Sequence, residues 1–388
     1  MGCPGTVGAV EPVELVTPNR PGAGRLHLRP WNDGDVETVL RAGSDPAVQR
    51  WTLVPAPYTR ADAEDFVSRY VPQSWADGAE LVWAVCDATS GTPLASVGLH
   101  PARLEGVREV GYWCLPEARG RGVVPEALRA VTRWAFAELG LARLDWATEV
   151  GNAASLRVAV KAGFAYEGRR RASLRQRDGS LRDGWWATRL PSDGPDGAPP
   201  ALPDPGVLTA GDLRLRPWRA EDAVALATAV AGERDALPPA PPGLSSTEHA
   251  RWWATERAPE QWAAADGAPM AVLHPDGAVA ASLQLFLRGR RQGVAEVGVW
   301  VTPAFRGRGV ATAAIGTLLA WAEPALNLAR VEWHSSPDNA ASLALAARLG
   351  FVREGIAVSA VARPDGTRRD DVVLARASTR TTVLPPST

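Results

Sequence analysis

The chain has 388 residues, of which 46% are hydrophobic, and a formal net charge of −1 at pH 7. These values are typical of a globular protein of two or more domains and do not favour a nucleic-acid or membrane binder. The three cysteines are too few for a disulfide framework, and the five histidines show no metal-ligand spacing. From this cysteine and histidine pattern we expect no bound metal. Because no signal peptide and no apolar run of about 18 residues is present, we expect a cytoplasmic protein.

Residues 1–22 are rich in Gly and Pro and are expected to be disordered. Strands and helices are then predicted from hydrophobic periodicity. The expected strands cover 25–30, 81–86, 94–99, 109–115 and 143–148, and the expected helices cover 33–42, 60–75, 122–139 and 153–163. Two further strands flank Asp178-Gly179, which is a hairpin signal. This order, with a strand–helix–strand crossover at its centre, predicts a mixed α/β domain.

The second half of the chain repeats the first at an offset of 187 residues. Glu109–Gly122 returns as Glu296–Gly309 with nine of fourteen positions identical, and Asn152–Leu156 returns unchanged as 339–343. The hairpin signal also recurs, at Asp365-Gly366. A period this long indicates two domains with separate cores rather than a solenoid. We therefore predict domains over 23–190 and 209–376, a Pro-rich linker over 191–208 and a tail over 377–388.

Each repeat carries a predicted strand that runs through a short turn into Arg-Gly-Arg-Gly and then a helix. Glycines let backbone N–H groups approach an anion, and a helix N-terminus favours negative charge. Arg119 and Arg121, with their counterparts Arg306 and Arg308, add cationic side chains. The spacing matches neither a dinucleotide fingerprint nor a Walker loop. A plain strand–helix turn with exposed arginines is the alternative, and the duplication of the arginines favours a phosphate loop.

Arg306-Gly-Arg-Gly-Val-Ala311 resembles the acyl-CoA loop of the GNAT superfamily of N-acetyltransferases. The flanking Gly-x-Trp, Asn-Ala-Ala-Ser and Gly-Phe motifs resemble the branch that acetylates the N-termini of ribosomal proteins. This resemblance implies two tandem GNAT-like domains, each with a splayed central sheet flanked by helices, and acetyl-CoA as co-substrate. The residues implied to bind it are Trp113, Cys114, Leu115, Arg119, Gly120, Arg121, Gly122, Val123 and Asn152, and Trp300, Val301, Thr302, Arg306, Gly307, Arg308, Gly309, Val310, Ala311 and Asn339.

The resemblance also implies direct attack of an amine on the thioester, with the oxyanion held by backbone N–H groups at 113–115 and 300–302. Glu109 and Glu296 are candidate bases, against the alternative of solvated carboxylates at a strand end. Five residues before the Asn, where some relatives carry a glutamate, stand Ala147 and His334, so His334 is a second candidate base. Ser155 and Ser342 are candidate acids, or hydroxyl groups that bond the helix start.

We therefore expect an N-acetyltransferase that uses a primary amine, either a protein N-terminus or a small molecule. The alternative is an acyl-CoA-binding protein in which one or both domains are inactive. Val124 stands where the motif has Gly or Ala, so the second domain is expected to be the more active. Neither nucleic acid nor a membrane is expected as a partner. The acceptor amine and the oligomeric state stay open.

Overall fold

The computed structural model describes residues 10–198, 202–233, 237, 241–362 and 366–378. Contacts divide the chain into two units, Met1–Pro200 and Ala201–Thr388. The unit boundary lies inside the Pro-rich segment 191–208 that we predicted as a linker. Asp365 of the second predicted hairpin, the first nine residues and most of the predicted tail lie outside the described residues.

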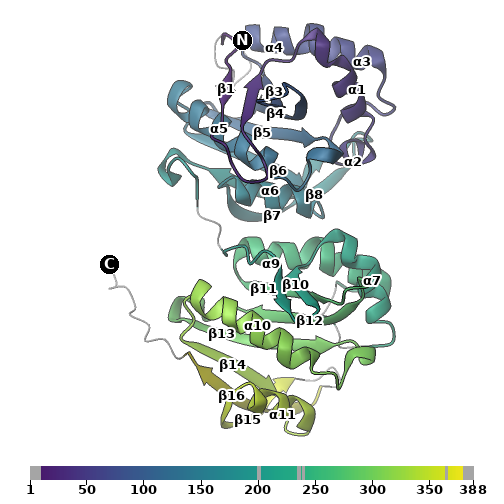
Figure 1. Ribbon diagram of the computed structural model, residues 1–388, viewed down its shortest axis with the longest axis vertical. Coiled ribbons are helices and arrows are strands. Elements are labelled where there is room, and N and C mark those ends of the chain that lie inside the picture. The colour runs from purple at the N-terminus through teal and green to yellow at the C-terminus, as the bar shows by residue number, and fades with distance from the viewer. Residues whose placement is uncertain (1–9, 199–201, 234–236, 238–240, 363–365, 379–388) are drawn as a thin grey trace. The chain divides into compact units, whose positions relative to one another are not determined.

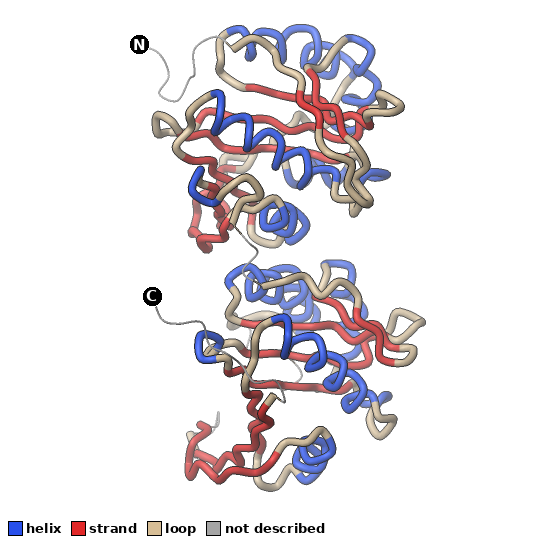
Figure 2. The backbone as a smooth tube through the Cα atoms, turned by 60° about the vertical axis from the view of Figure 1, so that its left-hand side comes forward, coloured by secondary structure: helices blue, strands red, loops and turns tan. Residues whose placement is uncertain are grey.

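The first unit is a mixed sheet with helices on both faces (Figure 1; Figure 2). Its described strands follow the order β1-β2-β3-β4-β5-β6-β8-β7. The elements are β1 Leu15–Val16, β2 Leu26–Arg29, α1 Val36–Gly43, α2 Pro46–Trp51, α3 Arg60–Asp65, α4 Val71–Ala76, β3 Leu81–Asp87, β4 Pro93–Pro101, β5 Val107–Cys114, α5 Val123–Glu138, β6 Arg143–Glu149, α6 Ala153–Lys161, β7 Ala165–Arg175 and β8 Leu181–Arg189.

The second unit repeats this plan, with its described strands in the order β9-β10-β11-β12-β13-β14-β16-β15. Its elements are β9 Leu208–Ala210, β10 Leu213–Pro217, α7 Ala223–Ala229, α8 Ser246–Trp252, α9 Ala258–Ala264, β11 Gly267–Leu273, β12 Val279–Phe286, β13 Val294–Val301, α10 Val310–Ala325, β14 Arg330–Ser335, α11 Ala340–Arg348, β15 Val352–Ala362 and β16 Arg368–Ala377. The two sheets confirm the predicted pair of α/β domains.

The N-terminal segment departs from the expectation of disorder. β1 pairs with β2, and the Thr17 side chain accepts a hydrogen bond from the Leu26 N–H at 3.0 Å. Ala23 is 2% exposed. The prediction for 1–22 is therefore wrong for residues 10–22, because composition does not show that the segment pairs with a strand edge.

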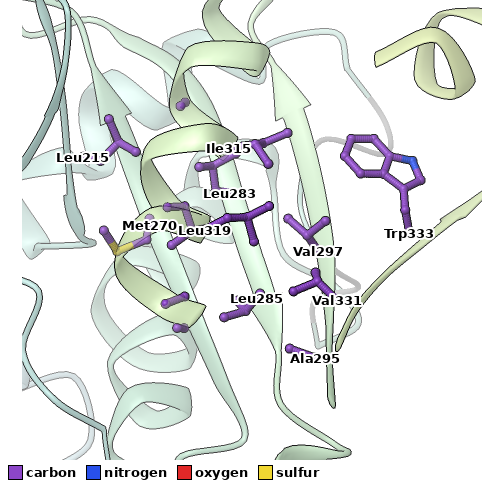
Figure 3. Close-up of a cluster of buried hydrophobic side chains, with 14 of the residues drawn as sticks. Leu215, Met270, Leu283, Leu285, Ala295, Val297, Ile315, Leu319, Val331 and Trp333 are labelled. Carbon is purple, nitrogen blue, oxygen red and sulfur yellow. The ribbon is translucent and has the colours of Figure 1, made fainter. Parts of the chain in front are cut away.

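Alternating strand residues supply a core to each face of the sheet in the second domain. On one face, Ile315 and Leu319 of α10 point at Leu283 and Leu285 of β12 and at Val297 of β13 (Figure 3). On the other face, Trp218 and Trp253 pack with Ala271, Leu273 and Leu226. Because successive strand residues point to opposite faces, β13 sends Val297 into one layer and leaves Glu296 and Trp300 on the other.

A buried ion pair joins the first long strand of each domain to its first helix. Arg216 donates two hydrogen bonds of 2.8 Å to Asp222, which also accepts from the Arg219 N–H at 2.8 Å. Arg29 and Asp35 make the same pair in the first domain. The Arg216 and Asp222 side chains are 11% and 6% exposed, so each charge depends on the other.

Asp222→Ala is expected to destabilise the second domain by about 3–5 kcal/mol, because it leaves a buried guanidinium unpaired. Denaturant unfolding of the full chain, followed by tryptophan fluorescence, measures the shift. Glu221→Ala is the matched control, since that side chain is 67% exposed and lies 3.8 Å from Arg216. A loss in the control as large as in Asp222→Ala would contradict the role of the pair.

Candidate functional site

Two neighbouring strands of each sheet part after a short parallel contact. β5 pairs with β6 only where Val107–Glu109 lies beside Arg143–Asp145, whereas its pairing with β4 continues to Cys114. In the second domain, β13 and β14 pair only between Val294–Glu296 and Arg330–Glu332. The parallel pairing ends at Glu109 on β5 and at Glu296 on β13, the two glutamates predicted as candidate bases. These forks confirm the splayed sheet and open a slot lined by strand backbone.

The Arg-Gly-Arg-Gly loop lies at the far end of the same strand in each domain. Its glycines are left-handed, with φ between 73° and 84°, a conformation that a side chain disfavours. α5 and α10 start directly after them, at Val123 and Val310, so the first N–H groups of a 16-residue helix have no helical partner. Val123 and Val310 are buried and offer only their backbone. This geometry suits an anion.

The first arginine of each loop is held by the protein itself. Arg119 donates to the Cys114 carbonyl at 3.1 Å and to Asp45 at 2.7 Å. Arg306 likewise donates to the Val301 carbonyl at 3.0 Å and to Glu233 at 2.6 Å. These side chains tie the loop to its strand and to the preceding helical region. The exposed Arg121 and Arg308 are thus the loop arginines better placed to meet a phosphate.

Val124 does not stand in the way of a ligand at the helix start. Its side chain is 4% exposed and belongs to the core, whereas the open end of the helix faces solvent. Glu126, two residues on, is also buried and accepts from Arg129 at 2.9 Å. The valine that separates the two loops in sequence therefore points inward. The structure therefore gives no reason for this valine to weaken a cofactor site in the first domain.

The backbone donors differ from those expected. The Leu115 N–H donates to the Leu94 carbonyl and the Thr302 N–H to the Ala280 carbonyl, each at 3.0 Å. Both N–H groups are therefore occupied, so Leu115 and Thr302 are wrong as oxyanion donors. Because strand residues alternate, the N–H groups of Cys114 and Val301 point away from β4 and β12, toward the slot.

In the second domain, four ionisable side chains gather at the fork. His334 Nδ1 lies 2.6 Å from Asp371, and its Nε2 lies 3.7 Å from Glu332. Burial raises the pKa of Glu296, against the opposing effect of His334 and Arg288. Burial lowers the pKa of His334, but the bond to Asp371 and the charges of Glu296, Asp371 and Glu332 outweigh it and raise that pKa. The structure thus brings both predicted bases together and adds Asp371.

In the first domain, the same positions hold Glu109, Ala147 and Gly184. Burial raises the pKa of Glu109, and the charge of Asp145 raises it further. The first domain therefore keeps the strand glutamate and lacks the histidine–aspartate pair of the second.

A tyrosine that the sequence analysis missed lies in the slot of the first domain. The Tyr112 hydroxyl is 2.8 Å from Ser155 Oγ and accepts from Trp146 Nε1 at 2.9 Å. In the second domain, Val299 replaces the tyrosine, and the Trp333 indole donates directly to Ser342 Oγ at 2.9 Å. The difference Tyr112/Val299 inside the repeated motif was the signal that could have found it. Ser155 and Ser342 thus lie in matched places beside unlike neighbours.

Asn152 and Asn339 are N-caps of α6 and α11. The Asn339 side chain accepts from the Ser342 N–H at 3.0 Å, and that of Asn152 from the Ser155 N–H at 3.2 Å. Asn339→Ala is expected to destabilise the second domain by about 1 kcal/mol, since it removes this cap. Thermal unfolding measures the change, and rescue by Asn339→Asp separates the cap from a ligand contact. An unchanged melting temperature would contradict the capping role.

No described helix is long and apolar enough to span a membrane. In the part of the chain that the structure describes, no three His, Cys, Asp or Glu side chains are grouped so that they would hold a metal ion.

Known proteins resemble parts of this chain. YoaA of Bacillus subtilis (strain 168), named an uncharacterized N-acetyltransferase, is 26% identical over 145 residues, 37% of this chain and 81% of YoaA. YdaF of the same organism, which bears the name of a ribosomal N-acetyltransferase, is 39% identical over 66 residues, 17% of this chain and only 36% of YdaF. A solved structure of Mycobacterium smegmatis RimJ in complex with CoA-disulfide is 26% identical, and the match covers 45% of this chain and 86% of RimJ, with a TM-score of 0.38.

A family model described as an acetyltransferase (GNAT) domain matches residues 25–165 and again residues 212–352. Each match contains the fork between the central strands and the glycine loop. The chain therefore belongs to the GNAT acetyltransferase family and carries one such domain in each half.

Proposed function

We propose that the chain is an N-acetyltransferase that moves an acetyl group from acetyl-CoA to a primary amine. The observation that carries this proposal is the fork beside the glycine loop, which occurs in both domains at matched residues. The loop and the helix start provide N–H groups for the phosphates, and the slot provides strand backbone for the pantetheine arm. Both features lie in line along one strand, so one extended ligand spans them.

The reaction is direct attack of the amine on the thioester within a ternary complex. It requires a base for the amine, donors for the oxyanion and a proton for the leaving thiolate. The N–H groups of Cys114 and Val301 suit the oxyanion. In the second domain, His334 suits the base, with Asp371 bonded to Nδ1 as the group that orients it. Ser342, and Ser155 with Tyr112, are the hydroxyl groups that suit the donor of a proton to the thiolate.

The acceptor is proposed as a protein N-terminus, with a small-molecule amine as the other candidate. Support for a protein N-terminus comes from the name of YdaF as a ribosomal N-acetyltransferase. The helices that precede the fork differ between the domains, with Ala61–Phe66 in the place of Glu248–Trp253. We therefore propose that the two domains take different acceptors.

Release of CoA thiol from acetyl-CoA tests the proposal, using the full chain with peptides that bear free N-termini and with small primary amines. Turnover with at least one amine is expected, and it should require an intact loop in at least one domain. Binding of acetyl-CoA without turnover on any amine would instead favour an acyl-CoA-binding protein with inactive domains. Absence of both binding and turnover would contradict both functions.

A further inference from the structure

The first domain also has a histidine beside the glutamate of its fork, but this histidine comes from β4 and not from β6. His100 stands on β4 directly opposite Glu109 on β5. Its ring lies across two glycines, since a Cβ on Gly111 would come within 2.4 Å of His100 Nε2 and a Cβ on Gly98 within 3.2 Å. Gly98 and Gly111 are paired in the strand register, so the imidazole packs against backbone that carries no side chain at either position.

Glu80 and Tyr70 hold this ring in place. His100 Nδ1 lies 3.1 Å from Glu80, whose side chain is 22% exposed, and the Tyr70 hydroxyl donates to Glu80 at 2.6 Å. Burial raises the pKa of Glu80, but the His100 contact, the Tyr70 bond and the charge of Arg108 outweigh it, so this pKa is lowered. Glu80 is therefore a carboxylate that accepts a hydrogen bond from Nδ1–H. The tautomer assigned from this contact leaves the lone pair on Nε2, which bonds to no described residue.

The second domain lacks each member of this set. Phe286 stands opposite Glu296, where the first domain has His100, and Gly267 is the residue paired with Phe286. Conversely, Ala147 and Gly184 replace His334 and Asp371 in the first domain. Each domain thus has one histidine–carboxylate pair beside its fork glutamate. The histidine comes from β4, on one side of β5, in the first domain, and from β14, on the other side of the matching strand β13, in the second. A pair that served only to hold the sheet would have no reason to be exchanged in this way.

His100 and a small apolar cavity lie on the same face of the sheet. Trp113 follows Gly111 by two residues on the same face of β5. Its ring borders a cavity of about 40 Å³ that is also lined by Tyr58 and Phe66. The His100 side chain is 39% exposed, so part of the imidazole is open to solvent. An acceptor with an apolar group in this cavity would lie on the same face of the sheet as His100.

We propose that His100 is the general base of the first domain, with Glu80 and Tyr70 as positioning residues. This inference rests on the proposed acetyl transfer. Nε2 takes a proton from the ammonium form of the acceptor, and the amine nitrogen then forms a C–N bond to the thioester carbonyl. The C–S bond breaks, its electron pair leaves on sulfur, and the second amine proton neutralises the thiolate. Nε2 returns its proton to water before the next turnover.

The test uses the full chain with Gly309→Trp, which silences the second domain, so that CoA thiol release reports the first. His100→Phe is the main variant, because Phe286 shows that a phenyl ring fits at this position. It should lower kcat by about 10²-fold at neutral pH, with the KM for acetyl-CoA within about twofold. Glu80→Gln should lower kcat less and leave the KM for acetyl-CoA unchanged, because the imidazole stays but loses the carboxylate that lies 3.1 Å from Nδ1.

Other charges near His100 are Glu109, which faces it directly, and Arg108 and Asp145, which act on Glu80 and Glu109. They remain in both variants, so the loss of turnover in Glu80→Gln belongs to Glu80. His27→Gln is the matched control, because His27, on β2, pairs with Glu14 at 2.7 Å away from the fork. It should leave kcat unchanged.

The outcomes distinguish a failure of the proposed role of His100 from a failure of the proposed acetyl transfer. Turnover by the first domain that is insensitive to His100→Phe, or a kcat that Glu80→Gln does not lower, overturns the role of His100 and leaves acetyl transfer standing. Loss of all turnover on silencing the second domain shows an inert first domain and also overturns it. Failure of the unsubstituted chain on every amine overturns the proposed function itself.

Discussion

Replacing His334 by Gln is expected to lower the turnover of the second domain by about 10²-fold near neutral pH, because the amine loses its base. Asp371→Asn should give a smaller loss, since the imidazole stays but loses the carboxylate that orients it at 2.6 Å. The full chain with Gly122→Trp, in which only the second domain is expected to bind acetyl-CoA, serves for both measurements. The readout is CoA thiol release at saturating acetyl-CoA.

The pH dependence of turnover by the second domain tests whether His334 acts as the base. A base must be neutral to accept a proton, so turnover rises with pH through the pKa of His334. That pKa is raised above the usual 6.5 of a histidine. The half-maximal pH of the second domain should therefore lie above 6.5. Asp371→Asn removes one of the charges that favour the imidazolium, so the half-maximal pH should fall while the plateau decreases.

His27→Gln again provides the control, as a histidine–carboxylate pair outside both forks. A Glu296→Gln variant separates the two predicted bases, because it removes this carboxylate, whose pKa is raised by burial, and leaves His334 with Asp371 in place. If Glu296→Gln abolishes turnover and His334→Gln does not, the glutamate is the base and His334 only tunes it.

The ionisable side chains at the fork of the second domain also show which parts of a site can be predicted from an amino-acid sequence. The Arg-Gly-Arg-Gly loop is contiguous, and its duplication at a fixed offset is enough to single it out. Asp371 meets His334 only because β16 runs antiparallel to β14, with Val373 opposite His334. These residues are 37 positions apart, and no local pattern sets their register. His100 depends in the same way on the pairing of β4 with β5.

Backbone roles were harder to predict than side-chain roles. The motif places Leu115 beside the loop, but whether its N–H points into the slot depends on the parity of the strand. The bond from the Leu115 N–H to the Leu94 carbonyl fixes that parity and moves the donor by one residue, to Cys114. Val124 was misjudged for a related reason, because its side chain turns into the core when α5 starts at Val123.

The second large effect is expected at the loop glycines. Gly122→Trp and Gly309→Trp should each weaken acetyl-CoA binding by about 10²-fold in their own domain, because φ values of 84° and 77° disfavour a side chain and the indole would fill the space in front of the helix start. Calorimetric titration of the full chain should therefore fall from two sites to one with either variant, and to none with both.

The hairpin glycines Gly179 and Gly366 are matched controls for this titration. Their φ values of 82° and 83° impose the same backbone cost, and their positions lie between β7 and β8 and between β15 and β16 rather than at the loops. Tryptophan at either position should leave two sites. Val124→Ala should change the affinity of the first domain by less than about twofold, since the valine is buried. A large gain in affinity with Val124→Ala would show that the valine does weaken the cofactor site of the first domain, and two sites in Gly122→Trp would place the phosphates elsewhere.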